Sequence, residues 1–132
     1  MLNNQDGMSQ ASCEPLKLGT ILILEDEVMV SMAMEAVVRD MGADQVLVLA
    51  DAARALDLVN CTRIDMAILD VHLGAGTSFA VADALEARGI PYVFSSALGA
   101  TAVEGRYRDR SMLSKPFPDE ELRTHLINLV RR

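Results

Sequence analysis

The sequence predicts an α/β domain in which helices cover both faces of a five-stranded parallel sheet. Short apolar runs alternate along the chain with segments of helical length, which is typical of consecutive β-α units. The apolar runs lack the polar alternation of half-exposed strands, so we expect strands that are buried on both faces. The chain has 132 residues, of which 51% are apolar, and this suffices for the core of one domain.

Five apolar runs are predicted to form the strands. In chain order they are TILIL (20–24), QVLVLA (45–50), MAILD (66–70), PYVFS (91–95) and SMLS (111–114). Their length and their content of Val, Ile and Leu favour short buried strands over helices. The first run is followed by the acidic residues Glu25, Asp26 and Glu27, and the third run ends at Asp70.

Helices are predicted between these strands and after the last one. They lie at residues 28–41, 51–59, 79–88 and 118–130. Gly42 and Gly89 end the first and the third of them, and Asp51 is a suitable N-cap for the second. Pro118 begins the last, where a proline is well tolerated. The connection before the fifth strand can hold only a short or irregular fourth helix, near residues 100–104, which makes about five helices in all.

Parallel strands that alternate with helices are joined by right-handed crossovers. For a chain of this length, this favours a flavodoxin-like, doubly wound sheet with the strand order 2-1-3-4-5. Residues 1–17 show no periodicity and are predicted to be a disordered N-terminal tail, so the folded domain is expected at residues 18–132.

The composition argues against several classes of function. A formal net charge of −7 disfavours nucleic acid and anionic membranes as main partners. The chain starts with a polar segment rather than a secretory signal, and its apolar runs are far shorter than a membrane span. The two cysteines, Cys13 and Cys61, are too few for a disulfide framework and are expected to be reduced thiols. We therefore expect a cytoplasmic protein.

Three carboxylates are predicted to converge at one edge of the sheet. In a doubly wound sheet, ligands bind at the carboxyl ends of the strands, where the strand order reverses. Glu25 and Asp26 follow the first strand, and Asp70 ends the third, which is its neighbour. Crowded carboxylates repel one another unless a cation neutralises them, and a site with only oxygen ligands favours Mg²⁺.

Such a site is suited to phosphoryl chemistry. A carboxylate beside a bound metal can act as a nucleophile on a phosphoryl donor. Lys115, after the fifth strand, can stabilise the negative charge of the transferred group, and a hydroxyl at the end of the fourth strand can donate to it. Strand alternation lets only one of Ser95 and Ser96 face the site, and Ser96 is the favoured candidate.

Four segments, LILEDE, AILDVHLG, FSSA and SKPF, resemble in order and spacing the signature segments of two-component response-regulator receiver domains. The resemblance implies that Asp70 is the phosphorylated residue. It also implies that Asp26 and Asp70 bind Mg²⁺ directly, that Glu25 acts through water, and that the backbone carbonyl of His72 completes the protein's ligands.

The same resemblance assigns the phosphoryl contacts. It implies that Ser96 is the switch hydroxyl and that Lys115 contacts the phosphoryl group. The backbone N–H groups of Val71 and Ala97 are expected to bind phosphoryl oxygens. The peptide bond from Lys115 to Pro116 is expected to be cis, as is usual in that family.

Three residues are expected to modulate the site. His72 and Leu98 would lie at its mouth, where His72 would control the access of water and thus dephosphorylation. Met112 stands three positions before Lys115, where the family usually has an aromatic residue whose rotation reports phosphorylation. This feature and the segment SFAVADALEARGIPYVF resemble the FAT GUY type of single-domain receivers, although that type has Phe-Ala-Thr-Gly where this chain has Phe94-Ser95-Ser96-Ala97.

The resemblance implies a phospho-acceptor of a bacterial two-component phosphorelay. Its expected donor is the phospho-histidine of a sensor histidine kinase or of a histidine phosphotransfer protein. No output segment follows Val130, so we expect signalling through a downstream protein partner or use as a phosphate sink; a weak homodimer is also compatible with the sequence. We expect no enzyme activity beyond the catalysis of its own phosphorylation and dephosphorylation.

Two other functions are compatible with an aspartate at the end of a strand, a phosphatase and a binding module without phosphorylation. A small phosphatase of the haloacid dehalogenase type would need a second acid two residues after the nucleophile, and His72 stands there instead. A pseudo-receiver that binds a partner without phosphorylation would not need the intact carboxylates and lysine. The first helix is apolar around most of its circumference, and we expect a face with Met29 and Met32 to dock a partner.

Overall fold

The computed structural model describes residues 18–74, 76–103 and 105–131, so the predicted disordered tail, residues 1–17, lies outside the described residues. The main sheet consists of β1 (Thr20–Leu24), β2 (Gln45–Leu49), β3 (Met66–Asp70), β6 (Tyr92–Ser96) and β7 (Met112–Ser114). The helices around it are α2 (Val28–Asp40), α3 (Ala52–Cys61), α4 (Phe79–Ala87) and α5 (Asp119–Val130). The remaining elements are β4 (His72–Leu73), β5 (Gly76–Thr77) and the 3₁₀ turns η1 (Gly99–Ala102) and η2 (Gly105–Tyr107).

The strand order is β2-β1-β3-β6-β7, and all four pairings are parallel. When only the five strands of the main sheet are numbered in chain order, this is the predicted order 2-1-3-4-5 of a flavodoxin-like sheet. At the carboxyl edge Leu24 pairs with Leu69, and Asp70 pairs with Ser95. The strand order reverses between β1 and β3, so the residues that follow these two strands meet at one place.

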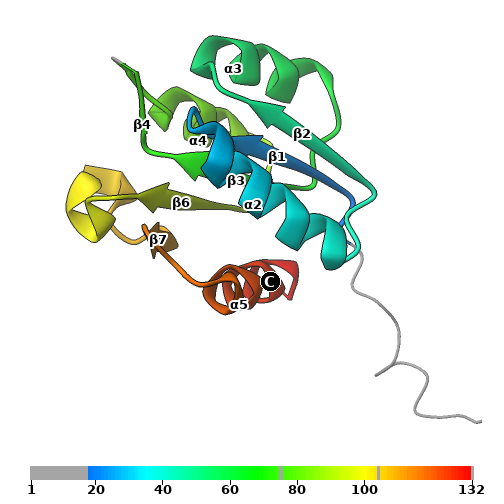
Figure 1. The fold of residues 1–132 in the computed structure, drawn as a ribbon. Coiled ribbons are helices and arrows are strands. Elements are labelled where there is room, and N and C mark those ends of the chain that lie inside the picture. Colours follow the sequence, from blue (N-terminus) through cyan, green and yellow to red (C-terminus); the bar gives the residue numbers. More distant parts are fainter. Residues whose placement is uncertain (1–17, 75, 104, 132) are drawn as a thin grey trace, which may run out of the picture.

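The core is divided into two halves by the sheet, with α2 and α5 on one face and α3 and α4 on the other (Figure 1). Side chains alternate between the halves: Ile21 and Ile23 pack under α2 and α5, whereas Leu22 and Leu24 pack under α3 and α4. All four are 0% exposed. Both faces of the strands are therefore buried, as the continuous apolar runs predicted.

The helix signals in the sequence are confirmed within one or two residues. The Asp51 side chain accepts a hydrogen bond from the Ala53 N–H at 2.9 Å and so caps α3. Gly42 and Gly89 follow α2 and α4 with φ angles of 100° and 70°, which a residue with a side chain rarely adopts.

Two connections contain structure that the sequence did not specify. The region expected to hold a short or irregular fourth helix forms η1 and η2, so the described residues contain four α-helices and two 3₁₀ turns. The region expected to be a loop after β3 forms the antiparallel hairpin of β4 and β5, in which His72 pairs with Thr77. Strands of two residues carry no periodicity, which explains why the hairpin was not predicted.

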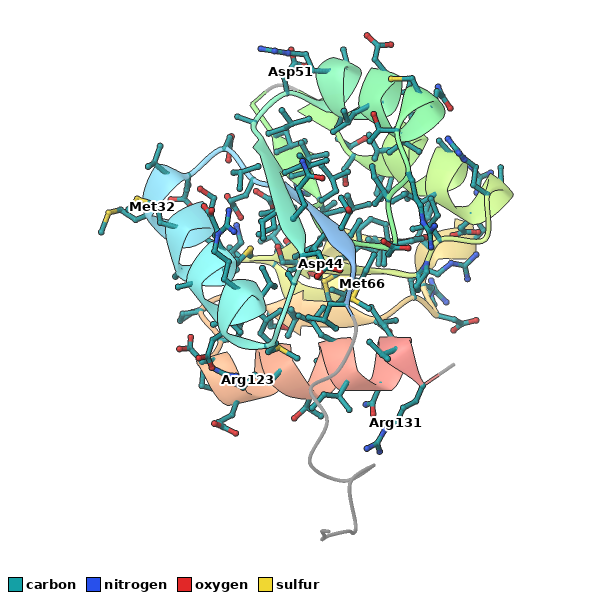
Figure 2. The ribbon with its side chains drawn as sticks, turned by 90° about the vertical axis from the view of Figure 1, so that its right-hand side faces the viewer. Met32, Asp44, Asp51, Met66, Arg123 and Arg131 are labelled. Atoms are coloured by element: carbon teal, nitrogen blue, oxygen red, sulfur yellow. The ribbon has the colours of Figure 1, made fainter. Side chains whose placement is uncertain are left out.

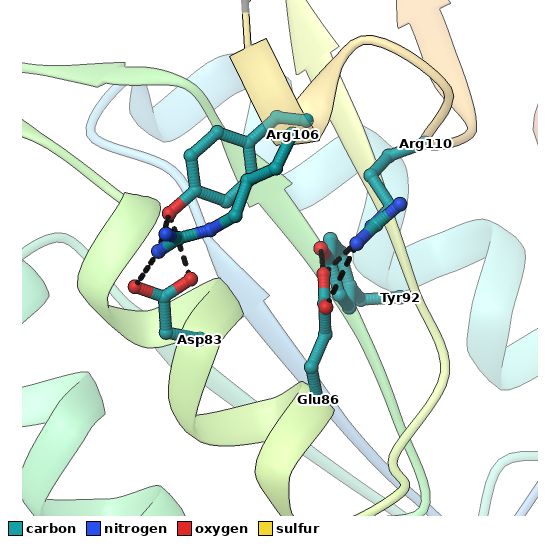
Figure 3. Close-up of polar contacts among 6 residues, drawn as sticks. Asp83, Glu86, Tyr92, Arg106 and Arg110 are labelled. Carbon is teal, nitrogen blue, oxygen red and sulfur yellow. Dashed lines mark hydrogen bonds and ion pairs between the residues drawn. The ribbon is translucent and has the colours of Figure 1, made fainter.

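Two groups of polar contacts join α4 to the chain around η2 and β6, and we call them the α4 clamp (Figure 3). The α4 clamp consists of Asp83 with Arg106 and Tyr107, and of Glu86 with Arg110 and Tyr92. Arg106 Nη2 lies 2.5 Å from Asp83 Oδ2, and the Tyr107 hydroxyl donates to Asp83 Oδ1 at 2.7 Å. Arg110 contacts both oxygens of Glu86, at 2.7 and 2.9 Å, and the Tyr92 hydroxyl donates to Glu86.

Among the described residues, none of the helices has the length and apolar character needed to cross a bilayer. The apolar side chains that do reach the surface are instead concentrated on α2. Val28, Met29 and Met32 are 69%, 80% and 60% exposed, and Met32 projects from α2 away from the rest of the molecule (Figure 2).

Candidate functional site

The carboxyl ends of β1 and β3 bring three carboxylates together, as the sequence predicted. Glu25 and Asp26 follow β1, and Asp70 is the last residue of β3. One oxygen of each lies within 4.8 Å of the others, a grouping that could hold a metal ion. Glu25 and Asp70 are only 2% and 6% exposed, whereas Asp26 is exposed to solvent. The cluster is thus a buried acidic pair with one open side.

Lys115 is the cation of this cluster. It directly follows β7, and its N–H donates to the Ser96 carbonyl at 2.8 Å, which fixes its backbone to β6. Its Nζ lies 2.7 Å from Glu25 Oε1, 3.3 Å from Asp70 Oδ2 and 3.9 Å from Glu27 Oε1. The Lys115–Pro116 peptide bond is cis, as the sequence resemblance implied.

The electrostatics of the cluster show that one lysine does not neutralise it. Burial and the charge of Glu25 raise the pKa of Asp70 to about 6, although Lys115 opposes the shift. Burial alone would lower the pKa of Lys115, but the hydrogen bond to Glu25 and the charge of Asp70 outweigh it, and the pKa is raised. Asp70 therefore bears a negative charge that its surroundings stabilise poorly.

The donor set fits a hard divalent cation. Three carboxylates and one lysine leave an excess of negative charge, and the oxygens already lie within 4.8 Å of one another. Oxygen ligands alone are typical of Mg²⁺ sites, which also retain water molecules, and the exposed side of Asp26 leaves room for them. Glu25, Asp26 and Asp70 can thus hold a metal at this edge.

Two backbone groups that orient the carboxylates were missed by the sequence analysis. The Glu27 N–H donates to Glu25 Oε2 at 3.1 Å, and the Gly74 N–H donates to Asp26 Oδ2 at 3.2 Å. Glu27 was visible as the third acid after β1. Gly74 was not, because its contact depends on the β4–β5 hairpin bending back over the site.

The two serines at the end of β6 lie on opposite faces of the sheet. Val93 packs under α2 and α5, and Phe94 packs under α3 and α4, so alternation places Ser95 with Val93 and Ser96 with Phe94. By the same alternation along β3, Asp70 lies on the face of Ser95. The Ser96 Oγ accepts a hydrogen bond from the Leu98 N–H at 3.0 Å, which leaves its own O–H free to donate. Its switch role stays a prediction.

One backbone group that was expected to bind the phosphoryl group has a partner within the sheet. The Val71 N–H, expected to bind a phosphoryl oxygen, instead donates to the Ser95 carbonyl at 3.0 Å as a continuation of the β3–β6 ladder. Val71 is 0% exposed, and the binding of its N–H to a phosphoryl oxygen stays a prediction. Ala97 and Leu98 are exposed at the end of β6, Leu98 by 61%. The phosphoryl contact of the Ala97 N–H and the modulating role of Leu98 stay predictions.

The other modulating residues are placed as follows. The His72 side chain is exposed on β4, directly after the Asp70–Val71 pair. Met112 is half-buried at the start of β7 and packs against the core under α3 and α4. The effects of both residues on the site stay predictions, as does the contribution of the His72 carbonyl to metal binding.

An apolar cavity of about 460 Å³ adjoins the acidic cluster. It lies between α2 and the β7–α5 connection, with Met29, Met34, Phe117 and Leu122 among its lining residues. Lys115 lines it as well, so the cavity and the cluster share a side chain. The exposed apolar face of α2 is therefore continuous with the charged site.

Comparisons with known proteins agree with this geometry. The family model described as the response regulator receiver domain matches residues 21–127. No curated protein sequence matches the chain significantly.

Solved structures of receiver domains superpose on the chain. SdrG from Sphingomonas melonis Fr1 is 37% identical with a TM-score of 0.74, and the match covers 87% of this chain and 98% of SdrG. The BeF₃-activated conformation of SdrG from Pseudomonas melonis Fr1 is 39% identical, with a TM-score of 0.74 and coverage of 86% and 98%.

The receiver domain of the sensor histidine kinase PA1611 from Pseudomonas aeruginosa PAO1 shares the fold. It is 24% identical, with a TM-score of 0.70 and coverage of 86% and 98%. That structure has a magnesium ion coordinated in its active site cleft. On the family match, the strand order and the acidic cluster with its lysine, this chain belongs to the response regulator receiver domain family of two-component signalling.

Proposed function

We propose that this domain accepts a phosphoryl group on Asp70 from a phospho-histidine of a partner protein, with Mg²⁺ held by Glu25, Asp26 and Asp70. The observation that supports this most is the convergence of three carboxylates and Lys115 within a few ångströms at one sheet edge. A bound Mg²⁺ would neutralise part of this charge and attract the oxygens of the phosphoryl group.

The transfer step follows from the placement of the residues. An Asp70 oxygen attacks the phosphorus, and the bond from phosphorus to the donor's imidazole nitrogen breaks, with its electron pair remaining on the imidazole. Lys115, 3.3 Å from Asp70 Oδ2, is placed to stabilise the charge of the transferred group. Ser96 and the Ala97 N–H would supply further donors, because the Ser96 Oγ accepts from the Leu98 N–H and its own O–H is free to donate.

Two structures of relatives support the proposal. SdrG adopts a BeF₃-activated conformation, and the PA1611 receiver domain coordinates magnesium in its active site cleft. The carboxylates of this chain lie at the sheet edge where a doubly wound fold binds its ligands. The reaction is stoichiometric: the domain catalyses only its own phosphorylation and dephosphorylation and has no separate substrate to turn over.

The phosphodonor protein is proposed to dock on α2. Met29 and Met32 are among the most exposed apolar side chains of the described residues, and Met29 also lines the cavity that contains Lys115. A donor seated on this face would bring its histidine next to Asp70. Flexible methionine side chains can adapt to a partner surface, which suits a transient complex.

The proposed output is a protein contact or the withdrawal of phosphate from a kinase. Met112 cannot report phosphorylation by the rotation of an aromatic ring, which favours a simple phosphate sink or a different conformational response. We propose a cytoplasmic location, with a sensor histidine kinase or a histidine phosphotransfer protein as the partner.

The decisive experiment is incubation with acetyl phosphate and Mg²⁺, followed by intact mass spectrometry. We expect one phosphoryl group on the wild type, none on Asp70→Asn, and a strongly reduced amount on Lys115→Ala. Asp83→Asn, which changes an aspartate outside the site, should label like the wild type. Equal labelling of wild type and Asp70→Asn would contradict the proposal, and continued turnover of a small phosphate ester would favour a phosphatase instead.

A second experiment separates docking from chemistry. Met29→Asp should slow phosphotransfer from the cognate phospho-histidine protein but leave labelling by acetyl phosphate unchanged, because only the donor's surface is affected. Ala53→Asp, an exposed change on α3, is the matched control and should affect neither. Unchanged transfer from the protein donor to Met29→Asp would remove the docking assignment.

A further inference from the structure

Ser95 carries a hydroxyl that the fold does not use. Its side chain is 0% exposed, and its Oγ has no hydrogen-bond partner among the described residues. Burying a hydroxyl without a partner costs free energy, and most buried polar groups in proteins are paired. An alanine would fill this position without that cost. The hydroxyl is therefore a candidate for a function.

The place of this hydroxyl is next to the nucleophile. Ser95 is the register partner of Asp70 across β3 and β6, and the Val71 N–H donates to the Ser95 carbonyl at 3.0 Å. Neighbouring strands are about 4.8 Å apart, and both side chains lie on the face of α2 and α5. A serine hydroxyl and an aspartate carboxylate in that relation are within hydrogen-bonding reach after a side-chain rotation.

In the structure, the Asp70 carboxylate contacts Lys115 rather than Ser95. Its Oδ2 lies 3.3 Å from the Lys115 Nζ, and that ammonium group is at the same time 2.7 Å from Glu25 Oε1. A phosphoryl group and a metal would both compete for these contacts and reorient the carboxylate. The Ser96 Oγ accepts from the Leu98 N–H, and by strand alternation Ser96 lies on the opposite face of the sheet. Of the two serines, Ser95 is therefore the one on the side of Asp70, and its hydroxyl has no partner among the described residues.

We propose that Ser95 is a positioning residue that donates a hydrogen bond to the Asp70 carboxylate and thereby accelerates the loss of the phosphoryl group. This inference rests on the proposed function. In hydrolysis, a water oxygen attacks the phosphorus and the bond from phosphorus to the Asp70 oxygen breaks. The electron pair of that bond returns to Asp70 as its carboxylate, and both hydrogens of the water leave with the inorganic phosphate, as H₂PO₄⁻. A donor at Asp70 stabilises the charge that develops there.

The test compares the phosphoryl lifetimes of purified full-length variants that have been labelled with acetyl phosphate and Mg²⁺. After removal of the donor, intact mass spectrometry follows the decay of the labelled form. Ser95→Ala should lengthen the half-life about three- to tenfold, the effect of one hydrogen bond on a rate. Ser95→Cys keeps a weaker donor of similar size and should lie between alanine and the wild type.

Controls distinguish this role from a structural one. Ser78→Ala removes the other buried serine hydroxyl without a partner, at the start of α4, and should leave the half-life unchanged. Urea unfolding of the metal-free proteins should show that Ser95→Ala is at least as stable as the wild type. If Ser95 had only a structural role, Ser95→Ala would lower the free energy of unfolding. The decay rates of Ser95→Ala, Ser95→Cys and the wild type would then not rise in that order.

Each outcome decides the question. An unchanged or shorter half-life for Ser95→Ala, with normal labelling, overturns the inference and leaves the proposed function intact. A wild type that acquires no phosphoryl group overturns both. A longer half-life for Ser95→Ala that Ser95→Cys partly reverses, with Ser78→Ala at the wild-type value, supports a hydrogen bond from Ser95 to the leaving carboxylate.

Discussion

The acidic cluster and the α4 clamp are two groups of charged residues that lie in opposite electrostatic situations. In the cluster, Glu25 and Asp70 are buried beside a single lysine, and the pKa of Asp70 is raised to about 6 by burial and by Glu25. In the clamp, each carboxylate has its own arginine and tyrosine near the surface. Hydrogen bonds from Tyr107 and Arg106 lower the pKa of Asp83, and those from Arg110 and Tyr92 lower the pKa of Glu86.

This difference separates a site that needs a ligand from a site that only holds the fold together. The clamp is neutralised within the chain, so it gains nothing from an added cation. The cluster has an excess of negative charge that the chain leaves uncompensated, and a metal ion or a protonated carboxyl group would relieve it. A buried charge without a compensating partner lowers the stability of the fold. We infer that the carboxylates are nevertheless retained because they carry out chemistry at this position.

The largest expected effect is that Asp70→Asn stabilises the metal-free protein. The folded pKa of Asp70, about 6, lies above the ordinary aspartate value of 3.8. The folded state therefore loses stability as the pH rises from about 4 through 6, and above that range the loss amounts to about 3 kcal/mol. The asparagine carries no charge and avoids this loss. Urea unfolding in the presence of EDTA should show a gain of that order at pH 8 and almost none near pH 3.5.

Asp83→Asn in the clamp is the matched comparison for this substitution. Asp83 has a lowered pKa, so its charged form is stabilised in the folded state and its removal should weaken the protein at neutral pH. The two aspartate-to-asparagine changes are thus expected to have opposite signs at pH 8. A loss of stability in both variants would show that the cluster is not electrostatically strained.

The next effect in size is stabilisation by Mg²⁺. A ligand that binds only the folded state at about 100 times its dissociation constant adds about 2.7 kcal/mol to the free energy of unfolding. We expect this gain for the wild type and a much smaller one for Asp26→Asn, which loses one of the three carboxylates. Differential scanning fluorimetry with increasing MgCl₂ measures it. Glu86→Gln should respond like the wild type, and an equal response of Asp26→Asn would place the metal elsewhere.

The smallest effect is expected in the clamp itself. Glu86→Gln should lower the free energy of unfolding by about 0.5–1 kcal/mol, since the pair with Arg110 is bidentate but half-exposed. In this variant the buried Tyr92 hydroxyl can still donate to the side-chain carbonyl oxygen of the glutamine. Chemical denaturation at low salt measures this change, which should shrink in 1 M NaCl because salt screens the ion pair. A loss of several kcal/mol would mean that the clamp is a core element rather than a surface contact.

Most of the sheet could be predicted because its signals are local. The runs that form β1 and β3 are continuously apolar, and Asp51, Gly42 and Gly89 mark helix ends by the chemistry of one or two residues. The parallel order followed from the alternation of strands and helices. The hairpin of β4 and β5 could not be predicted in this way, because four residues in two strands leave no pattern to detect.

The site was predicted to the extent that strand ends determine it. Glu25, Asp26, Asp70 and Lys115 come together because each ends or follows a strand whose place in the sheet was predicted. The partner of one backbone group was not predicted: the N–H of Val71 donates to the Ser95 carbonyl within the sheet ladder, and its expected phosphoryl contact stays a prediction. Which carbonyl a particular N–H meets depends on the register of two strands, and the sequence does not contain that register.

The sequence alone determined which residues carry charge and at which edge of the sheet they gather, since strand periodicity and strand order suffice for both. Only the tertiary structure decided how that charge is balanced: that Lys115 pairs with Glu25 as well as with Asp70, that the Gly74 N–H contacts Asp26, and that the Ser95 hydroxyl has no partner. These contacts join atoms from distant segments over a few ångströms. Their presence depends on side-chain packing and strand register, which no local pattern in the chain specifies.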